Sequence, residues 1–305
     1  MATVLITGGT GLIGTALTSL LRDRGFDIII LTRKIPGRKR DRVQGVQYMT
    51  WNLRRQILDP RAIQQADYIV HLAGAGVAEK RWTAKRKVEI RKSRVESCQL
   101  LVKALRDTSH HVKAVVSASA IGWYGQNAAA PFVESDPPDA GFLGETCRLW
   151  EASIQPVTEM NIRLTILRTG IVLARTGGAL PAFKKPVRLG IAAILGNGSQ
   201  MISWIHIADL CRIYLDAIIN ENLSGVFNAV APDPVSNKTL TLALAKKMKG
   251  DFFIPLHVPS FFLKMLLGEM SIEVLKSAMV SADKIRGTGF QFIYPSLESA
   301  LGDLA

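Results

Sequence analysis

The stretch VLITGGTGLIGTALTSLLRDRG covers residues 4–25, and DIIILTRK follows it at residues 27–34. The apolar start of the first stretch predicts a buried strand, and the apolar spacing after Leu12 predicts a helix. The glycines between strand and helix lack a Cβ, so the chain can turn tightly there. Together the two stretches predict a strand–helix–strand unit at the front of a parallel sheet.

The glycine cluster carries a phosphate-binding pattern. Gly9, Gly11 and Gly14 form G-x-G-x-x-G, and their place between a strand and a helix makes the pattern specific. Backbone N–H groups of such a turn, together with the helix N-terminus, favour a pyrophosphate; the alternative is a plain strand–helix turn. We predict that a dinucleotide contacts Thr7, Gly8, Gly9, Thr10, Gly11, Leu12, Ile13 and Gly14.

The second strand ends in basic residues. In proteins that bind NAD, an Asp or Glu about 20 residues beyond the glycines accepts hydrogen bonds from the ribose. No acid lies between Ile28 and Lys34 here, and Arg33 and Lys34 stand in that place. A guanidinium can bind the 2′-phosphate of NADP(H) through two hydrogen bonds, which predicts about a 10- to 100-fold preference for NADP(H). Alternatively, the two side chains only begin a basic loop.

Strand and helix patterns alternate through the first two-thirds of the chain. Apolar, β-branched runs at 46–51, 68–74, 113–119 and 162–170 alternate with helical patterns at 59–66, 84–106 and 143–160. This alternation predicts an α/β protein with a doubly wound parallel sheet of the Rossmann type. We assign residues 1–175 to this nucleotide-binding domain, with residues 202–230 returning to it.

The pattern loosens beyond about residue 175. The segment GGALPAFKKPVRLGIAAILGNG is rich in Gly and Pro, which favours a ligand-covering segment over a strand or helix. Next comes a strand–helix pair in which Asp209 is expected to begin or cap the helix. An apolar helical region is predicted through about residue 282. We expect residues 176–201 and 231–305 to form a smaller α+β domain on the substrate side.

Composition restricts the partners. The net charge of +13 gathers at residues 34–42 and 81–94, but neither cluster has the interleaved aromatic residues of a nucleic-acid surface, so solvated faces are the preferred interpretation. The three cysteines lack the spacing of a metal site or a disulfide framework. No apolar run reaches about 18 residues. We expect a cytoplasmic protein without a metal, a membrane or a nucleic acid as partner, and leave a homodimer open.

Further motifs resemble the extended branch of the short-chain dehydrogenase/reductase superfamily. TGGTGLIG, HLAGAG at 71–76, SAIGWYG at 119–125 and WIHIADL at 204–210 are similar to motifs of its NAD-dependent epimerase/dehydratase family. RTGIVL, GNGSQ and the late GEMSIEVLKSAMV resemble SulA-like members that end in a small domain of unknown function. The resemblance implies bound NADP(H) beside Leu72, Ala73, Gly74 and Ala75, with the nicotinamide near Ser119, Arg168, Thr169 and Gly170.

The chain also departs from that family. Extended members carry a Tyr-x-x-x-Lys pair after the fifth strand, in which the Tyr transfers a proton and the Lys lowers its pKa. Leu143 and Cys147 fall in those places here, and the usual catalytic Ser or Thr falls on Ala120. The acid that often ends the third strand near the adenine is replaced by Asn52, followed by Leu53. The usual proton-transfer residues are therefore absent.

Three residues are candidates to replace them. Tyr124 follows the fifth strand, where ligands bind in open α/β sheets, and Ser119 and Cys147 are expected near the same cleft. Two of them have a structural alternative: Tyr124 can simply cap the strand and pack, and Cys147 can be a small buried apolar side chain. His206 is expected to hold strand and helix together.

Two functions remain. The first is an NADPH-dependent oxidoreductase or epimerase-like enzyme acting on a small carbonyl or sugar-type substrate, with Tyr124, Cys147 or Ser119 in catalysis. The second is a protein that binds NADP(H) without turnover and reports the state of the cofactor to a partner. The loss of Tyr-x-x-x-Lys favours the second, because a positioned acid contributes about 10²–10⁴-fold to the rate.

Overall fold

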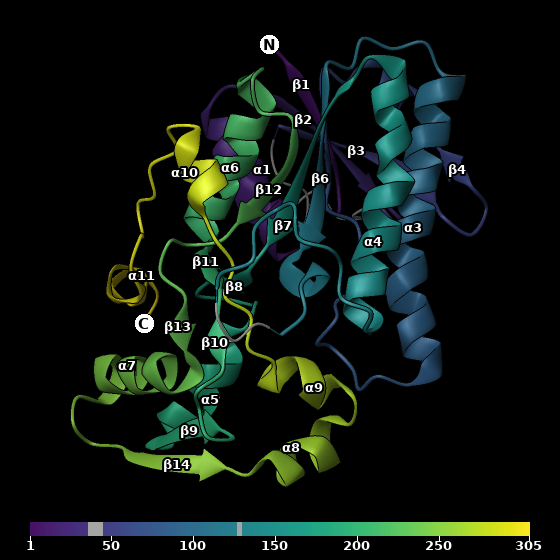
Figure 1. The fold of residues 1–305 in the computed structure, drawn as a ribbon. Coiled ribbons are helices and arrows are strands. Elements are labelled where there is room, and N and C mark those ends of the chain that lie inside the picture. The colour runs from purple at the N-terminus through teal and green to yellow at the C-terminus, as the bar shows by residue number, and fades with distance from the viewer. Residues whose placement is uncertain (36–44, 127–129) are drawn as a thin grey trace.

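An eight-stranded sheet forms the centre of the protein in the computed structural model, which describes residues 1–35, 45–126 and 130–305 (Figure 1). The strand order is β12-β7-β6-β5-β1-β2-β3-β4, and neighbours run parallel except β3 and β4. The strands are β1 (Thr3–Thr7), β2 (Asp27–Thr32), β3 (Val46–Asn52), β4 (Ile57–Leu58), β5 (Tyr68–His71), β6 (Ala114–Ala120), β7 (Arg163–Thr169) and β12 (Gly225–Ala229). The predicted doubly wound sheet is confirmed.

Helices cover both faces of the sheet. Helices α1 (Leu12–Asp23) and α6 (Ile207–Ile219) share one core with one face, and α2 (Pro60–Gln64), α3 (Ala84–Asp107) and α4 (Phe142–Ile154) share another core with the opposite face (Figure 1). Because both faces are covered, successive residues of a central strand are buried whichever face they point to, as Ile28, Ile29 and Ile30 show on β2.

The order of the strands creates a switch point beside β1. The chain leaves β1 for β2 on one side and later returns to β5 on the other side. Ligands of open α/β sheets bind where the connections diverge in this way, outside the carboxyl ends of the strands. The glycine loop lies at that end of β1.

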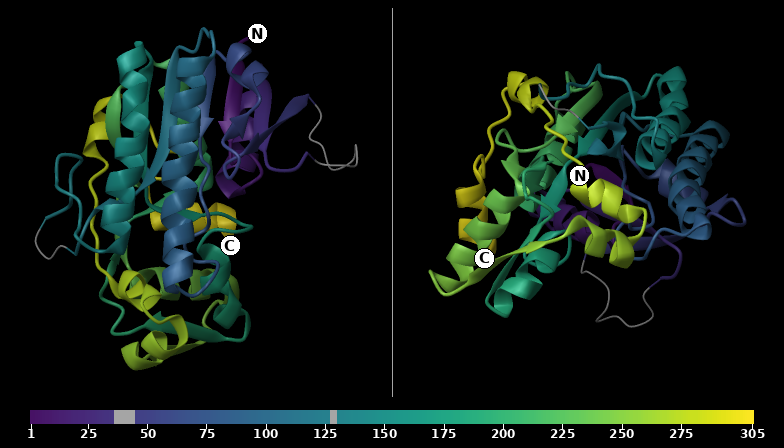
Figure 2. Two further views of the ribbon diagram at one scale, coloured as in Figure 1. Left: turned by 90° about the vertical axis from the view of Figure 1, so that its right-hand side faces the viewer. Right: turned by 60° about the horizontal axis from the view of Figure 1, so that its bottom comes forward.

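The later part of the chain adds smaller elements below the sheet (Figure 2). Strand β9 pairs with β14, and helices α5 and α7 pack on β9. Strand β10 pairs with β13, and β8 with β11. Their bounds are β8 (Ile171–Leu173), α5 (Leu180–Arg188), β9 (Ile191–Leu195), β10 (Met201–Ile202), β11 (Trp204–His206), β13 (Val235–Ser236), α7 (Asn237–Lys249) and β14 (Ile254–Val258). The domain boundaries drawn from the sequence stay a prediction.

Four short helices complete the chain: α8 (Ser260–Leu267), α9 (Met270–Leu275), α10 (Asp283–Gly287) and α11 (Leu297–Leu304). The apolar helical region expected through residue 282 ends at Leu275, because residues 278 and 280 instead form extended bridges to Ile202 and Phe132. In the described parts of the chain, no helix is both long and apolar enough to span a bilayer.

The expectation that 176–200 lacks helix and strand is wrong. Helix α5 and strand β9 lie within it. Pro181 stands in the first turn of α5, where its missing N–H costs nothing, and Leu180 and Val187 lie two turns apart on one buried face. Packing against α7 therefore outweighs the weak local preference.

Two predicted helix ends also differ. Helix α4 stops at Ile154, and a 3₁₀ helix (Gln155–Met160) follows, because Pro156 cannot continue the α-helical hydrogen bonds. Helix α6 is capped by His206, whose Nδ1 accepts from the backbone N–H of Ala208, and not by Asp209. The structural role expected of His206 is confirmed.

Candidate nucleotide-binding site

The glycine loop packs too closely for side chains. A Cβ on Gly14 would lie 2.4 Å from the carbonyl oxygen of Gly8 and 2.5 Å from the Cα of Gly9. Gly8 adopts a φ of 71°, which strongly favours glycine. A Cβ on Gly9 would meet the Ile30 side chain at 2.8 Å. These glycines are thus required for the turn and for packing of the helix on the strands.

The N-terminus of α1 is open to an anion. Gly11 is the N-cap, in extended conformation, and among the described residues no side chain accepts a hydrogen bond from the first turn, which also contains no acid. Gly11 and Thr10 are exposed. Unsatisfied N–H groups and the partial positive charge of the helix end favour a phosphate at this place.

Thr7 has a structural role beneath the loop. It is fully buried, and its Oγ1 accepts from the backbone N–H groups of Leu72 and Ala73 at 3.1 and 3.2 Å. Its oxygen also lies 2.9 Å from Nδ1 of His71, whose Nε2 lies 3.0 Å from Ser97 Oγ. Burial lowers the pKa of His71 to about 4, so the ring is neutral and can accept from Thr7 while donating to Ser97. This chain of bonds fixes the end of β5 against the glycine loop.

The predicted segment 72–75 lies beside the glycine loop. A Cβ on Gly8 would stand 2.9 Å from the backbone of Leu72. Helix α3 holds the segment from behind: Ser93 Oγ accepts from the N–H of Ala75, and Arg94 Nη1 donates to the carbonyl of Ala75. The two motifs predicted to contact the cofactor therefore lie side by side at the carboxyl ends of β1 and β5, and we call the place between them the crevice.

The basic doublet lies at the same edge of the sheet. Arg33 and Lys34 follow the last residue of β2, which neighbours β1, and both side chains are exposed. Most of the basic segment 34–42 falls outside the described residues. Asn52 ends β3, and its Oδ1 accepts from the N–H of Arg55 in a local turn, while Leu53 is partly packed against the core. Arg33 and Lys34 thus lie at the position where basic side chains would contact a 2′-phosphate.

A buried ion pair organises the far end of the crevice. Arg168 on β7 donates from Nε and Nη2 to the two carboxylate oxygens of Glu151, both at 2.9 Å, and Ser119 on β6 donates to Glu151 Oε1 at 2.6 Å. The side chains of Arg168 and Glu151 are only 3% and 9% exposed. Ser119 and Arg168 are register partners, so the pair ties α4 to the ends of both strands. The guanidinium of Arg168 is thus hydrogen-bonded within the protein, and the cofactor contact predicted for Arg168 stays a prediction.

Sequence reasoning missed Glu151 as a functional residue. The available signal was its position: Cys147, Trp150, Glu151 and Ile154 share the i, i+3, i+4, i+7 spacing of a buried helix face, and all four are buried. An acid on such a face requires a buried cation, which β7 supplies.

Tyr124 is fully buried in the same network. Its hydroxyl donates to Asn228 Oδ1 at 2.7 Å and accepts from Arg168 Nη1 at 3.0 Å, and its ring stacks on Phe132. Burial raises the pKa of this hydroxyl. The hydroxyl that the sequence put forward as a proton donor is therefore covered and already paired.

Cys147 and Ser119 are also covered. Cys147 is 4% exposed, its Sγ lies 3.7 Å from the carbonyl of Ala120, and burial raises the pKa of its thiol to about 12. Ser119 is 3% exposed and donates to Glu151. Thr169 is 9% exposed, and a Cβ on Gly170 would approach the backbone of Ser203 to 2.8 Å. The catalytic roles predicted for Tyr124, Cys147 and Ser119 stay predictions, and the geometry gives each a packing role.

The loop 177–178 reaches the nucleotide crevice. Cβ atoms on Gly177 and Gly178 would meet the side chain of Leu12 at 3.2 and 3.3 Å. Both glycines have positive φ, which suits a tight loop over the start of α1. This part of the segment therefore lies against the start of α1, and the ligand-covering role expected from the sequence stays a prediction.

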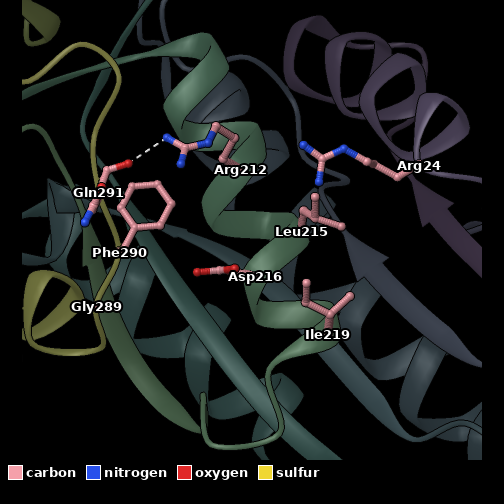
Figure 3. A pocket seen from close by; sticks show the side chains of 8 residues that line it. All are labelled: Arg24, Arg212, Leu215, Asp216, Ile219, Gly289, Phe290 and Gln291. Carbon is pink, nitrogen blue, oxygen red and sulfur yellow. Dashed lines mark hydrogen bonds between the residues drawn. The ribbon is translucent and has the colours of Figure 1, made fainter.

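A separate hollow of about 340 Å³ lies at the other end of α1 (Figure 3). Its wall includes Arg24, Arg212, Asp216 and Phe290. Arg212 is held there, because its Nη1 donates to Asp209 and to the carbonyl of Gln291. Arg24 directly follows the twelve-residue α1, so the hollow is about 18 Å from the glycine loop and distinct from the nucleotide crevice.

The fold and crevice define a class of protein. Residues 4–229 match the NAD dependent epimerase/dehydratase family, and residues 258–304 match a domain of unknown function, DUF1731. The chain belongs to this epimerase/dehydratase family and carries the DUF1731 domain at its C-terminal end.

Relatives share nearly the whole chain. An epimerase family protein of Staphylococcus aureus is 35% identical over 309 residues, covering 100% of this chain and 99% of its own. One from Mycobacterium bovis is 33% identical over 304 residues, covering 99% and 97%. The human epimerase family protein SDR39U1, whose crystal structure was solved with NADPH, is 32% identical, covers 99% of both chains and superposes with a TM-score of 0.86. The family resemblance read from the sequence is confirmed.

Proposed function

We propose that the protein binds NADP(H) and is an NADPH-dependent oxidoreductase acting on a small carbonyl or sugar-type substrate. The observation that carries the proposal is an anion site at the start of α1 with Arg33 and Lys34 exposed at the end of the neighbouring strand. The NADPH in the structure of the human relative supports it.

The residues of the crevice fit such a cofactor. The N–H groups at the start of α1 would bind the pyrophosphate, and the glycines leave no Cβ in its way. Arg33 would bind the 2′-phosphate, with Lys34 adding charge. The Glu151–Arg168 pair would hold the ends of β6 and β7 rigid beside the nicotinamide. Bound NADPH supplies a hydride from C4 of that ring.

The proton needs a different source from the one the sequence suggested. Tyr124 and Cys147 are covered, and burial raises the pKa of both. We therefore propose that solvent delivers the proton to the substrate oxygen. This makes chemistry slow compared with enzymes that position an acid, by about 10²–10⁴-fold.

A second candidate is binding of NADP(H) without turnover. The burial of Tyr124 and Cys147 favours it, since none of the proton donors proposed from the sequence is exposed. The C-terminal domain beside the crevice favours the oxidoreductase, because a binding-only protein needs no substrate side.

The cofactor proposal is tested by thermal unfolding with NADPH and with NADH. A ligand at 100 times its Kd adds about 2.7 kcal/mol to the free energy of unfolding. We expect NADPH to stabilise the protein more than NADH, and Arg33→Ala to reduce the NADPH effect while leaving that of NADH. Arg286→Ala, a surface arginine remote from the crevice, is the matched control. Equal stabilisation by both cofactors would remove the role given to Arg33.

Turnover is tested by NADPH oxidation with a library of aldehydes, ketones and keto-sugars. For a substrate that reacts, Tyr124→Phe should retain the rate within about tenfold, because solvent is the proton source. A fall of about 10²-fold or more, with NADPH binding intact, would restore Tyr124 as the acid. Tight NADPH binding with no oxidation across the library would favour the binding-only function.

A further inference from the structure

The part of the molecule around β14 and α8 carries a large exposed apolar face. It is formed by Leu189, Phe252, Ile254, Leu256, Phe261, Phe262, Met265 and Leu266, which are between 49% and 88% exposed. We call this set the apolar face. Each of these side chains exposes on the order of 100 Å² of apolar surface. The face as a whole therefore exceeds the few hundred Å² that an exposed apolar patch normally has on a monomer. A surface of this size marks a contact with another apolar phase or molecule.

The elements that carry most of the apolar face, β14 and α8, lie along the lower edge of the molecule (Figure 1). Strand β14 leads directly into α8, whose Phe261 and Phe262 rings lie 4.5 Å apart. Leu189 joins it from α5, because the next residue, Gly190, accepts a hydrogen bond from the N–H of Ile254. Of the eight residues of α8, only Leu263 is buried.

The chain segments that carry the face are basic. Segment 180–195 contains three Lys or Arg residues and no acid, and segment 238–267 contains five and one acid, Asp251. Among these, Lys185, Arg188, Lys247, Lys249 and Lys264 are exposed. An apolar surface with a basic rim is complementary to an anionic lipid bilayer, where aromatic and aliphatic side chains enter the interface and Lys and Arg bind head groups.

A second copy of the chain fits less well. Its own basic rim would face the first, and like charges repel. Strand addition is also blocked. The backbone groups of Ile254 and Val258 point toward β9. Those of Pro255 and His257 therefore point to the free edge of β14, where Pro255 has no N–H to donate to an added strand.

We propose that this face docks the protein peripherally on anionic membranes. The sequence excluded a membrane partner only because no segment could span a bilayer, and a peripheral contact needs no span. The docking does not depend on the proposed oxidoreductase function.

The test is co-sedimentation of the full chain with vesicles of phosphatidylcholine alone and with added phosphatidylglycerol. We expect binding to the anionic vesicles, weakened by salt, and little binding to phosphatidylcholine. Phe261→Ser with Leu266→Ser should weaken it by at least about tenfold, and Ile57→Ser, an equally exposed site elsewhere, should not. A cooperative thermal unfolding transition verifies that each variant is folded.

Charge is tested separately. Neutralising Lys246, Lys247 and Lys249 with Gln should weaken binding by at least about tenfold, whereas neutralising Lys92, Lys103 and Lys113, which changes net charge equally, should have a much smaller effect. Equal effects of the two triples would show non-specific attraction and overturn the proposal. Absence of vesicle binding would also overturn the proposal. This holds if the protein sediments as a monomer, and it holds equally if the protein sediments as a dimer that the variant Phe261→Ser with Leu266→Ser dissociates.

Discussion

At the scale of single residues, the nucleotide crevice depends on side chains that are missing as much as on those present. Gly14 has no space for even a methyl group, while His71 is buried and must stay neutral. The close packing around Gly14 and the burial of His71 each lead to a measurable prediction.

Gly14→Ala should destabilise the protein and abolish NADPH binding. The new Cβ would overlap the backbone of Gly8 and Gly9, which cannot move away as a flexible side chain could. We expect a loss of about 1–3 kcal/mol or more in the free energy of unfolding, measured with urea. Gly302→Ala, in α11 with nothing within 4 Å of the new methyl, should be neutral or stabilising by up to about 1 kcal/mol. Similar results for the two variants would contradict this.

His71 should make stability depend on pH. Its folded pKa of about 4 lies below the usual 6.5, so the unfolded chain binds a proton that the folded chain resists. The stability is complete above pH 6.5 and falls as the pH drops toward 4, by about 2–3 kcal/mol at pH 4.5.

The measurement is urea unfolding of wild type and His71→Gln at pH 7.5 and pH 4.5. The first pH lies roughly one unit above the unfolded pKa of His71, and the second lies between its folded and unfolded pKa values. The variant should lose less stability on acidification by about that amount. His257→Gln, at an exposed histidine, is the control and should behave like wild type. Parallel losses in His71→Gln and wild type would show that His71 does not cause the dependence.

At the scale of elements, α4 is joined to β6 and β7 by charge as well as by apolar packing. Glu151 receives hydrogen bonds from Ser119 and Arg168, and Arg168 also contacts Tyr124 and stacks its guanidinium 3.6 Å from the Trp123 ring centre. Removing one charge leaves the other buried and unpaired, which costs more than the pair itself contributes.

Glu151→Leu should therefore cost about 3–5 kcal/mol in the free energy of unfolding. The double variant Glu151→Leu with Arg168→Met should recover part of that loss, because no buried charge remains. Urea unfolding measures both. Glu145→Leu, which breaks an exposed pair with Arg148 on the same helix, should cost at most about 1 kcal/mol. A double variant less stable than Glu151→Leu alone would contradict this account.

At the scale of the whole molecule, a buried acid on helix α6 helps to hold the C-terminal segment in place. Asp209 on α6 is fully buried, and its two oxygens accept from the N–H groups of Ile293 and Tyr294 while Oδ1 also pairs with Arg212. His206, the cap of α6, lies 3.3 Å from Asp303 on α11. Together these contacts place the C-terminal segment against the nucleotide-binding part.

Asp209→Ala should loosen the C-terminal segment. It leaves two backbone N–H groups without acceptors, so we expect a loss of about 2–4 kcal/mol and faster amide hydrogen exchange over residues 289–305 than in the central strands. Asp283→Ala, at an exposed pair with Arg286, should change neither. Uniform acceleration across all strands would indicate global destabilisation and not a local tie.

The sequence by itself determined the doubly wound sheet, the glycine loop and the basic doublet, because these follow from periodicity and spacing within short stretches of chain. It did not determine that Glu151 pairs with Arg168, that Tyr124 is covered, or that residues 180–195 form a helix and a strand. Those depend on contacts between residues distant in sequence, where burial changes pKa values and packing outweighs local preference. The apolar face likewise became visible only once the fold showed which apolar side chains remain largely exposed.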